Sequence, residues 1–284
     1  MTNQINTEKS QVGSFVAGTL VHTKEGLKAI EQIKVGDYMH SKPESGTGEL
    51  AYKRVTKTFV RENCEVFGLT YGVKGKPALL VTTAEHPFWV SQVSVKDPNK
   101  QFGSMKVPHG QWVTPEDMFK AQDKYYKSNG TGYLGTYYLD SYDGNEYGVG
   151  ESAPICNATN KPKRNRVIDC SGSEFGAIWP VSRDYQRDAM GQGVDFRVNS
   201  PVILTLPTNT NITGDVDLNK KTRNTDKAAW IAGLTEYFTR GYQPKLCTVY
   251  NLEVEDYHTY FVGEQGIWVH NTCKNAAQNN NYVH

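Results

Sequence analysis

The sequence lacks several features that would assign it to familiar classes of protein. Its most apolar windows, such as residues 78–82, are far too short for a membrane-spanning helix. The 31 Lys and Arg residues nearly match the 30 Asp and Glu residues, which leaves a formal net charge of +1. This balance gives no electrostatic reason to expect a nucleic acid or an anionic membrane as partner. Residues 1–13 are polar and show no signal peptide, so the localisation stays open.

Cysteine is also scarce, and its spacing excludes the usual zinc frameworks. No two cysteines form a Cys-x-x-Cys pair, and the five are Cys64, Cys156, Cys170, Cys247 and Cys273. Cys156 and Cys170 could pair, but we interpret the cysteines as free, buried thiols. The pattern therefore predicts neither a metal site nor a disulfide scaffold.

Short β-type segments are abundant at both ends of the chain. Hydrophobic residues make up 38% of the sequence, which suits a globular protein with an ordinary core. Segments rich in Val, Thr, Phe and Tyr are separated by Gly or Pro over residues 14–90 and again over 247–271, where Gly-Glu-Gln-Gly predicts a hairpin turn at 263–266. Residues 26–39 are ambiguous, because their apolar positions also fit a helix. The sequence predicts an all-β fold.

The middle of the chain differs in composition. Residues 119–246 contain a Gly- and Tyr-rich run, a basic run (KPKRNR) and a long polar stretch, but no histidine. We expect this region to be an insertion into one domain whose two β-rich parts meet in space. The predicted organisation is an N-terminal flank, the first part of the domain, the insertion, the second part of the domain and a C-terminal flank: 1–13, 14–118, 119–246, 247–271 and 272–284.

Residues that could rearrange a peptide bond lie at the start of the first β-rich part. The Ser14 hydroxyl can attack the carbonyl of Gly13 and convert the amide into an ester. His86 is the candidate that protonates the leaving nitrogen, and Thr83 the candidate that holds the oxyanion through its hydroxyl or its amide. Gly13 has no Cβ, so this peptide can be approached closely or distorted at low cost.

A second reactive pair lies at the end of the last β-rich part. The Asn271 side-chain nitrogen can attack its own carbonyl, close a succinimide and release Thr272 as a new N-terminus. His270 and His258 are the candidate acid and base groups, and Thr272 could accept an acyl group from Ser14. Intramolecular attack supplies roughly 7–11 kcal/mol of the barrier, so we expect no cofactor. Each feature alone is common, and only their joint occurrence points to this chemistry.

In these segments the sequence resembles the Hint (Hedgehog/intein) superfamily, most closely the bacterial intein-like domains that precede polymorphic toxins. The resemblance implies an all-β Hint-type flattened horseshoe with pseudo-twofold symmetry, which processes its own flanking segments. It also implies the functional roles of the residues named above: Ser14, Thr83, His86, His258, His270 and Asn271. The segments that carry it are SFVAGTLVHTKEGLKAIEQIKVGD, LLVTTAEHPFWV, GQWVTPEDM and VYNLEVEDYHTYFVGEQGIWVHN.

Two positions depart from the family pattern. Family members usually begin with a cysteine, whereas this chain has Ser14, whose hydroxyl needs a base to become nucleophilic. Ser14 is either the natural residue or a replacement for cysteine that halts the reaction. Asn251 stands where many inteins carry an acidic residue that assists the first step. Both departures concern the N-terminal step and leave the C-terminal step unaffected.

The insertion shows no activity of its own. Residues 231–236 faintly resemble a LAGLIDADG endonuclease helix, but Phe238 occupies the position of the metal-binding acid. The absence of histidine excludes an HNH nuclease, and KPKRNR fits a solvated loop. We expect a structural or recognition subdomain with an unknown protein partner.

Three functional hypotheses remain open for the whole chain. The first is a self-processing domain that releases a downstream toxin, within a precursor that could be secreted. The second is an intein proper, excised from a host protein. The third is an inactive Hint scaffold that serves as a spacer or a binding module, which the intact His270-Asn271-Thr272 junction disfavours.

Overall fold

The fold consists almost entirely of β-strands, in agreement with the sequence. The computed structural model describes residues 13–73, 76–100, 104–127, 135–158, 166–169, 175–180, 202–205 and 243–271. These ranges contain one α-helix, α1 (Pro115–Lys127), and none of their helices is long and apolar enough to cross a membrane. The strands are β1 (Phe15–Val16), β2 (Leu20–Thr23), β3 (Gly26–Ala29), β4 (Tyr38–Ser41), β5 (Ala51–Glu65), β6 (Phe67–Val73), β7 (Lys76–Thr82), β8 (Phe88–Lys96), β9 (Ser104–Val113), β10 (Tyr137–Asp140), β11 (Glu146–Ala158), β12 (Arg166–Asp169), β13 (Phe175–Pro180), β14 (Val202–Thr205), β15 (Gln243–Pro244), β16 (Leu246–Val254), β17 (Thr259–Val262) and β18 (Ile267–His270).

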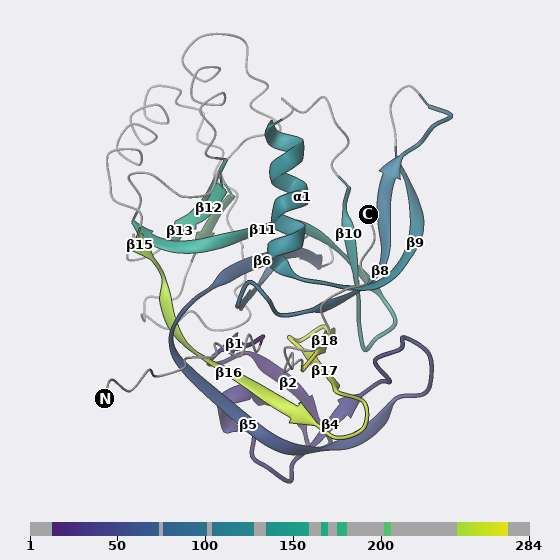
Figure 1. Ribbon diagram of the computed structural model, residues 1–284, viewed down its shortest axis with the longest axis vertical. Helices are drawn as coiled ribbons and strands as arrows, with labels where there is room; N and C mark the ends of the chain where they lie inside the picture. The colour runs from purple at the N-terminus through teal and green to yellow at the C-terminus, as the bar shows by residue number, and fades with distance from the viewer. Residues whose placement is uncertain are drawn as a thin grey trace, which may run out of the picture.

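The long strand β5 joins the two β-rich ends of the chain. Its first residues pair with β4, and the rest of the strand pairs antiparallel with β16, so that the two strands run side by side in Figure 1. On its other edge β16 pairs with β1, whose partner is also β7. The strand that follows Ser14 therefore lies between the C-terminal strand β16 and the strand β7 that leads to Thr83.

The segments expected to be strands form strands, and the ambiguous region is resolved. The predicted turn at 263–266 connects β17 and β18, and both of its glycines have positive φ angles. Residues 26–39 form β3, a short 3₁₀-helix (Ile30–Gln32) and the start of β4 rather than an α-helix. Ile30 and Ile33 are buried while Leu27 is exposed, so the apolar spacing reflects a turn that covers the core.

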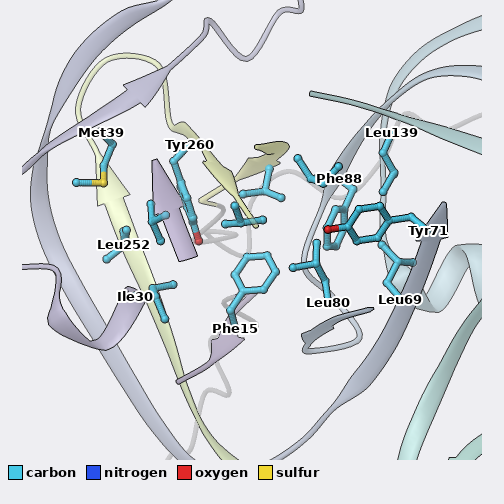
Figure 2. Packing of buried hydrophobic residues seen from close by; sticks show 14 of the residues in the cluster. Phe15, Ile30, Met39, Leu69, Tyr71, Leu80, Phe88, Leu139, Leu252 and Tyr260 are labelled. Atoms are coloured by element: carbon cyan, nitrogen blue, oxygen red, sulfur yellow. The ribbon is translucent and has the colours of Figure 1, made fainter. Parts of the chain in front are cut away.

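Two clusters of buried side chains form the core on opposite faces of the same strands. Leu80 packs in the first cluster, whereas its neighbours Leu79 and Val81 pack in the second. The two side chains of β1 also pack on opposite faces, Phe15 in the first cluster and Val16 in the second. Because successive side chains of a strand point to opposite faces, these strands separate the two clusters. Figure 2 shows part of the first cluster, in which Phe15 lies between the groups of side chains around Tyr260 and Phe88.

The first part of the predicted insertion belongs to this fold. Thr114 caps the N-terminus of α1: its Oγ1 accepts the amide of Asp117 (3.2 Å) and donates to the Asp117 carboxylate (2.7 Å). The helix packs against β11, which pairs with β6, while β10 pairs with β8. Phe119 and Ile155 are core residues. The β-fold therefore extends past the boundary expected at Phe119, and most of residues 159–242 lies outside the described ranges.

Candidate active site

Ser14 is buried at the start of β1, and its main chain is fixed by the end of β7. Its amide donates to the Oγ1 of Thr83 (3.1 Å), and its carbonyl accepts from the amide of Thr83 (2.9 Å) and the hydroxyl of Thr82 (2.9 Å). This differs from the contact expected from the sequence, in which Thr83 binds the carbonyl of Gly13. In the structure Thr83 holds the nitrogen that would leave, and its amide is already bound to Ser14.

His86 lies directly against the peptide bond that precedes Ser14. A Cβ added to Gly13 would lie 2.6 Å from the Nδ1 of His86 and 2.6 Å from its Cα, so no side chain fits at that position. The imidazole is fully buried and packs on Phe15, with 4.2 Å between the ring centroids. Within the described residues, neither ring nitrogen has a hydrogen bond of ordinary length.

The environment of His86 keeps its imidazole neutral. The pKa of His86 is lowered to about 3, chiefly by burial; the backbone of Gly13 opposes this shift, and His270 and Arg61 add smaller lowering contributions. A neutral imidazole carries one N–H and one free lone pair, so it can both accept and donate a proton. At neutral pH His86 therefore has the protonation state that a proton shuttle needs.

Asn271 follows β18, and the main chain around His258 holds its side chain. Oriented to satisfy both neighbours, its Nδ2 donates to the carbonyl of His258 (2.8 Å) and its Oδ1 accepts from the amide of Val254 (2.7 Å). The amide of Asn271 also donates to the His258 carbonyl (2.8 Å). His258 and Asp256 have positive φ angles of 54° and 61°. Strained backbone of this kind persists where the surrounding structure imposes it, as at functional sites.

The segment between Thr83 and Pro87 holds both candidate reactive ends. Thr83 binds the main chain of Ser14, and the carbonyl of Pro87 accepts the amide of His270 (3.1 Å). His270 is also among the groups whose charge lowers the pKa of His86. The structure thus brings together the expected residues Gly13, Ser14, Thr83, His86, His270 and Asn271.

Comparison with known proteins shows the family to which the chain belongs. The sequence profile of the pretoxin Hint domain family matches residues 20–138 and 236–272, more than half of the chain. The chain belongs to this family. A bacterial intein-like domain from Clostridium thermocellum is 24% identical to it, with a TM-score of 0.39 over 91% of this chain and 98% of that chain.

Two further solved structures are more distant. The gp41-1 intein is 14% identical, with a TM-score of 0.36 over 91% of this chain and 98% of that chain. A DnaB intein from Synechocystis sp. PCC 6803 is 9% identical, with a TM-score of 0.37 over 92% of this chain and 99% of that chain. A comparison with curated proteins finds no match. The resemblance expected from the sequence is confirmed by the family profile.

The Hint domain contains a cation beside Ser14 that the sequence did not reveal. The Nη2 of Arg61, on β5, donates to the Oγ of Ser14 (3.3 Å) and to the Oε1 of Glu85 (3.1 Å). Glu85 lies within the Thr-x-x-His segment, so this motif places an anion next to the cation. Arg61 is separated from Ser14 by 47 positions, and nothing in its local sequence distinguishes it from other basic residues of a solvated strand.

Glu44 is the second residue that the sequence did not reveal. Its Oε2 lies 2.6 Å from the Nε2 of His270, whose Nδ1 is buried without a partner in the described residues. Burial lowers the pKa of His270, and Glu44 opposes this shift by raising it. The hydrogen bond to Nε2 fixes the ring orientation and directs Nδ1 inward. The ring packs on Trp112, with 5.1 Å between centroids.

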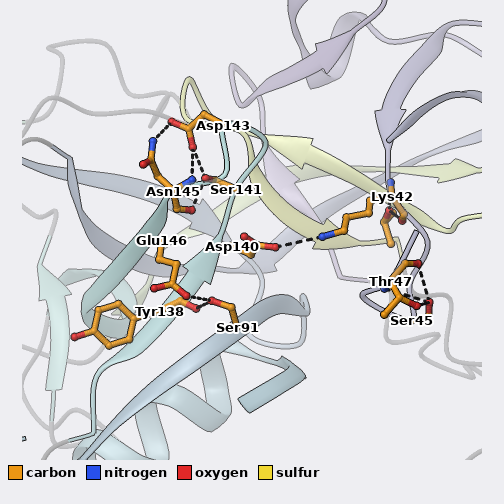
Figure 3. Close-up of polar contacts among 11 residues, drawn as sticks. Lys42, Ser45, Thr47, Ser91, Tyr138, Asp140, Ser141, Asp143, Asn145 and Glu146 are labelled. Carbon is orange, nitrogen blue, oxygen red and sulfur yellow. Dashed lines mark hydrogen bonds and ion pairs between the residues drawn. The ribbon is translucent and has the colours of Figure 1, made fainter. Parts of the chain in front are cut away.

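The loop that carries Glu44 is anchored on several sides. The Nε1 of Trp112 donates to the Glu44 carbonyl (3.1 Å), and the Lys42 ammonium lies 3.6 Å from the Asp140 carboxylate on β10. Figure 3 shows this ion pair together with the tight turn at Ser45 and Thr47. These contacts hold the Glu44 carboxylate in place although its side chain is 53% exposed.

The remaining residues singled out from the sequence have no side-chain contact with Ser14 or Asn271 among the interactions given above. The His258 side chain is exposed, and only its main chain contacts Asn271. Thr272 lies outside the described residues. Asn251 is fully buried, and its Oδ1 accepts from the Tyr260 hydroxyl (2.7 Å) and the Leu252 amide (2.8 Å). The Nδ2 of Asn251 has no hydrogen-bond partner in the described ranges. Among the described residues, no group of Asp, Glu, His and Cys side chains could hold a metal ion.

Proposed function

We propose that this Hint domain cleaves its own chain at the Gly13–Ser14 and Asn271–Thr272 bonds, with its flanking segments as the substrate. The observation that carries the proposal is the segment Thr83–Pro87, which binds both ends through main-chain and side-chain hydrogen bonds. One centre can then act on two bonds that are far apart in the sequence. Membership in the pretoxin Hint domain family supports this type of chemistry.

The N-terminal step is an N-to-O acyl shift. The Oγ of Ser14 attacks the carbonyl carbon of Gly13, the carbon–nitrogen bond breaks, and an ester replaces the amide. His86 takes the hydroxyl proton and delivers a proton to the leaving nitrogen, which Thr83 holds through its Oγ1. Arg61 stabilises the negative charge that develops on Oγ. The contacts that support these roles are the short approach of His86 to Gly13 and the hydrogen bonds of Ser14.

The C-terminal step is the cyclisation of Asn271. Its Nδ2 attacks its own carbonyl carbon, the bond to Thr272 breaks, and a succinimide forms while the amine leaves with a proton. The Val254 amide and the His258 carbonyl hold Oδ1 and Nδ2 of the side chain, and this fixed orientation favours attack by a weak nucleophile. The buried Nδ1 of His270 is the group that we assign to proton transfer, and the contribution of His258 that the contacts support is its main-chain carbonyl.

The product of this chemistry is a separated C-terminal flank. The family description, a pretoxin Hint domain, supports the release of a downstream toxin, for which residues 272–284 would be the first part. If the Thr272 hydroxyl attacks the ester at Ser14 first, the two flanks become joined instead. Release and joining share the same two sites and differ only in the acceptor of the acyl group.

Intact-mass spectrometry of the purified chain over time tests the proposal. We expect loss of the tail that begins at Thr272, with a succinimide or its hydrolysis product at Asn271. Asn271→Ala should abolish the release, whereas Asn251→Ala, which leaves the cyclising side chain in place, should retain it. Release of the tail at an unchanged rate from the Asn271→Ala protein would refute the proposed C-terminal step.

A further inference from the structure

Two cysteines face each other across the strands that border the candidate site. Cys64 near the end of β5 and Cys247 at the start of β16 are directly paired Cα partners in the antiparallel ladder. Directly opposed residues have Cα atoms roughly 4.5–5.5 Å apart, and their side chains point to the same face. A disulfide requires a Cα separation of about 4.4–6.8 Å, so this pair has the backbone geometry of a cross-strand disulfide.

The two thiols lie at the edge of the core, where a small reagent can reach them. Both cysteines are free and partly exposed, and both pack against the second core cluster rather than inside it. Burial raises the pKa of each thiol, while Arg61 lowers that of Cys64 and the neighbouring thiol raises that of Cys247. Cys64 is the more exposed side chain. It is therefore the thiol that a small reagent would reach first.

We propose that Cys64 and Cys247 form an intramolecular disulfide by exchange with a low-molecular-weight disulfide such as oxidised glutathione. The Cys64 thiolate attacks one sulfur of the reagent, the reagent's S–S bond breaks, and a reduced thiol leaves. The Cys247 thiolate then attacks the mixed disulfide at Cys64 and displaces a second reduced thiol. The protein loses two protons and two electrons, and the reagent is reduced to two thiols.

This disulfide would fasten the strands that position the candidate active site. Val249 of β16 pairs on one edge with β1 and on the other edge with Arg61 of β5. A covalent link between Cys64 and Cys247, across the register irregularity that separates this pair from the Arg61–Val249 pair, would hold the strand that carries Arg61 against the strand that adjoins β1. It also closes the long segment between residues 64 and 247, which constrains the unfolded chain strongly. The site is independent of the proposed self-cleavage, because both cysteines lie between Ser14 and Asn271.

The test is oxidation of the folded full chain with mixtures of oxidised and reduced glutathione. We expect a mass decrease of about 2 Da, a peptide that links Cys64 to Cys247, and a rise in the melting temperature of about 10 °C that dithiothreitol reverses. A variant in which the other three cysteines are serine should behave identically. Cys247→Ser is the matched control, and it should retain glutathione at Cys64 with no rise in melting temperature.

Two results would overturn the proposal. One is a wild-type chain that stays reduced, or stays singly glutathionylated at Cys64, when a chain denatured in the same mixture forms disulfides. The other is a link between different cysteines that leaves Cys64 and Cys247 open to alkylation. Circular dichroism of each oxidised sample confirms that the fold is intact during the measurement.

Discussion

Arg61 offers the sharpest test of the candidate active site, because its guanidinium binds the nucleophile directly. Its Nη2 lies 3.3 Å from the Oγ of Ser14. At that distance a full negative charge on Oγ would be attracted by about 5 kcal/mol at an effective dielectric constant of about 20. The Arg61 side chain is 30% exposed, and Glu85 at 3.1 Å competes for the same nitrogen, so the net effect is smaller.

We expect Arg61→Met to slow the N-terminal step by about 10- to 150-fold. This corresponds to a loss of roughly 1.5–3 kcal/mol, the range for a hydrogen bond to a charged group. Methionine keeps much of the aliphatic length and removes the charge. Glu85→Gln removes the competing anion, so the rate should hold or increase, while Arg61→Lys should recover part of the loss.

The assay isolates the first step by using Asn271→Ala as the background. Hydroxylamine cleaves the ester at Ser14, and the appearance of the fragment that begins at Ser14 is followed by intact mass. In Ser14→Cys protein, Arg61→Met should raise the pKa of the new thiol, which the pH dependence of its alkylation measures. A merely structural role for Arg61 would leave that pKa unchanged. An unaltered cleavage rate and an unaltered thiol pKa in folded protein would refute the electrostatic argument.

Four further predictions follow from the geometry. Gly13→Ala should slow the N-terminal step at least about tenfold and lower the melting temperature, because its Cβ would meet His86 at 2.6 Å. The pKa of His86 is about 3 in the folded chain and 6.5 in the unfolded chain, so the unfolded state binds more protons between these two pH values. The free energy of unfolding should therefore fall by up to about 1.4 kcal/mol per pH unit as the pH falls through that window. His86→Phe should remove this pH dependence of stability in urea titrations. Glu44→Gln should lower the pKa of His270 and shift the pH profile of tail release to lower pH. The rate of tail release at neutral pH should fall by about 10- to 100-fold. An unshifted pH profile would exclude an effect of Glu44 on His270 during tail release. Replacement of residues 159–242 by a two-residue turn should preserve folding and cleavage, because the end of β11 and the strand β15 on either side of the deletion are already paired. Loss of cleavage in a protein that still folds would show that the deleted part contributes to the site.

The strands could be predicted from the sequence because their signals are local, and the same holds for the choice of candidate reactive residues. Alternating apolar residues specify a strand without reference to its partner, and the glycines at 263 and 266 specify the hairpin. Ser14 and Asn271 were identified because their chemistry acts on the adjacent peptide bond. Both residues are buried in the structure, and their roles stay a prediction.

The same local signals do not show which residues of the predicted insertion pack with the two ends of the chain. The composition of residues 119–246 differs from that of the two ends, yet Phe119, Leu139 and Ile155 are core residues. A buried strand needs only a few apolar residues, so a Gly- and Tyr-rich stretch can still contribute strands such as β10 and β11. Composition alone cannot separate an inserted subdomain from an added part of the sheet.

Only the tertiary structure decided which distant residues share the candidate active site. The register between β5 and β16 places Arg61 near Ser14 and places Cys64 opposite Cys247. A shift of one residue would turn each of these side chains to the other face. Glu44 reaches His270 from a loop more than two hundred positions away. The sequence by itself determined which segments are strands and which bonds are candidates for reaction. The positions of the groups that assist those reactions depend on long-range pairing and packing, which no local pattern encodes.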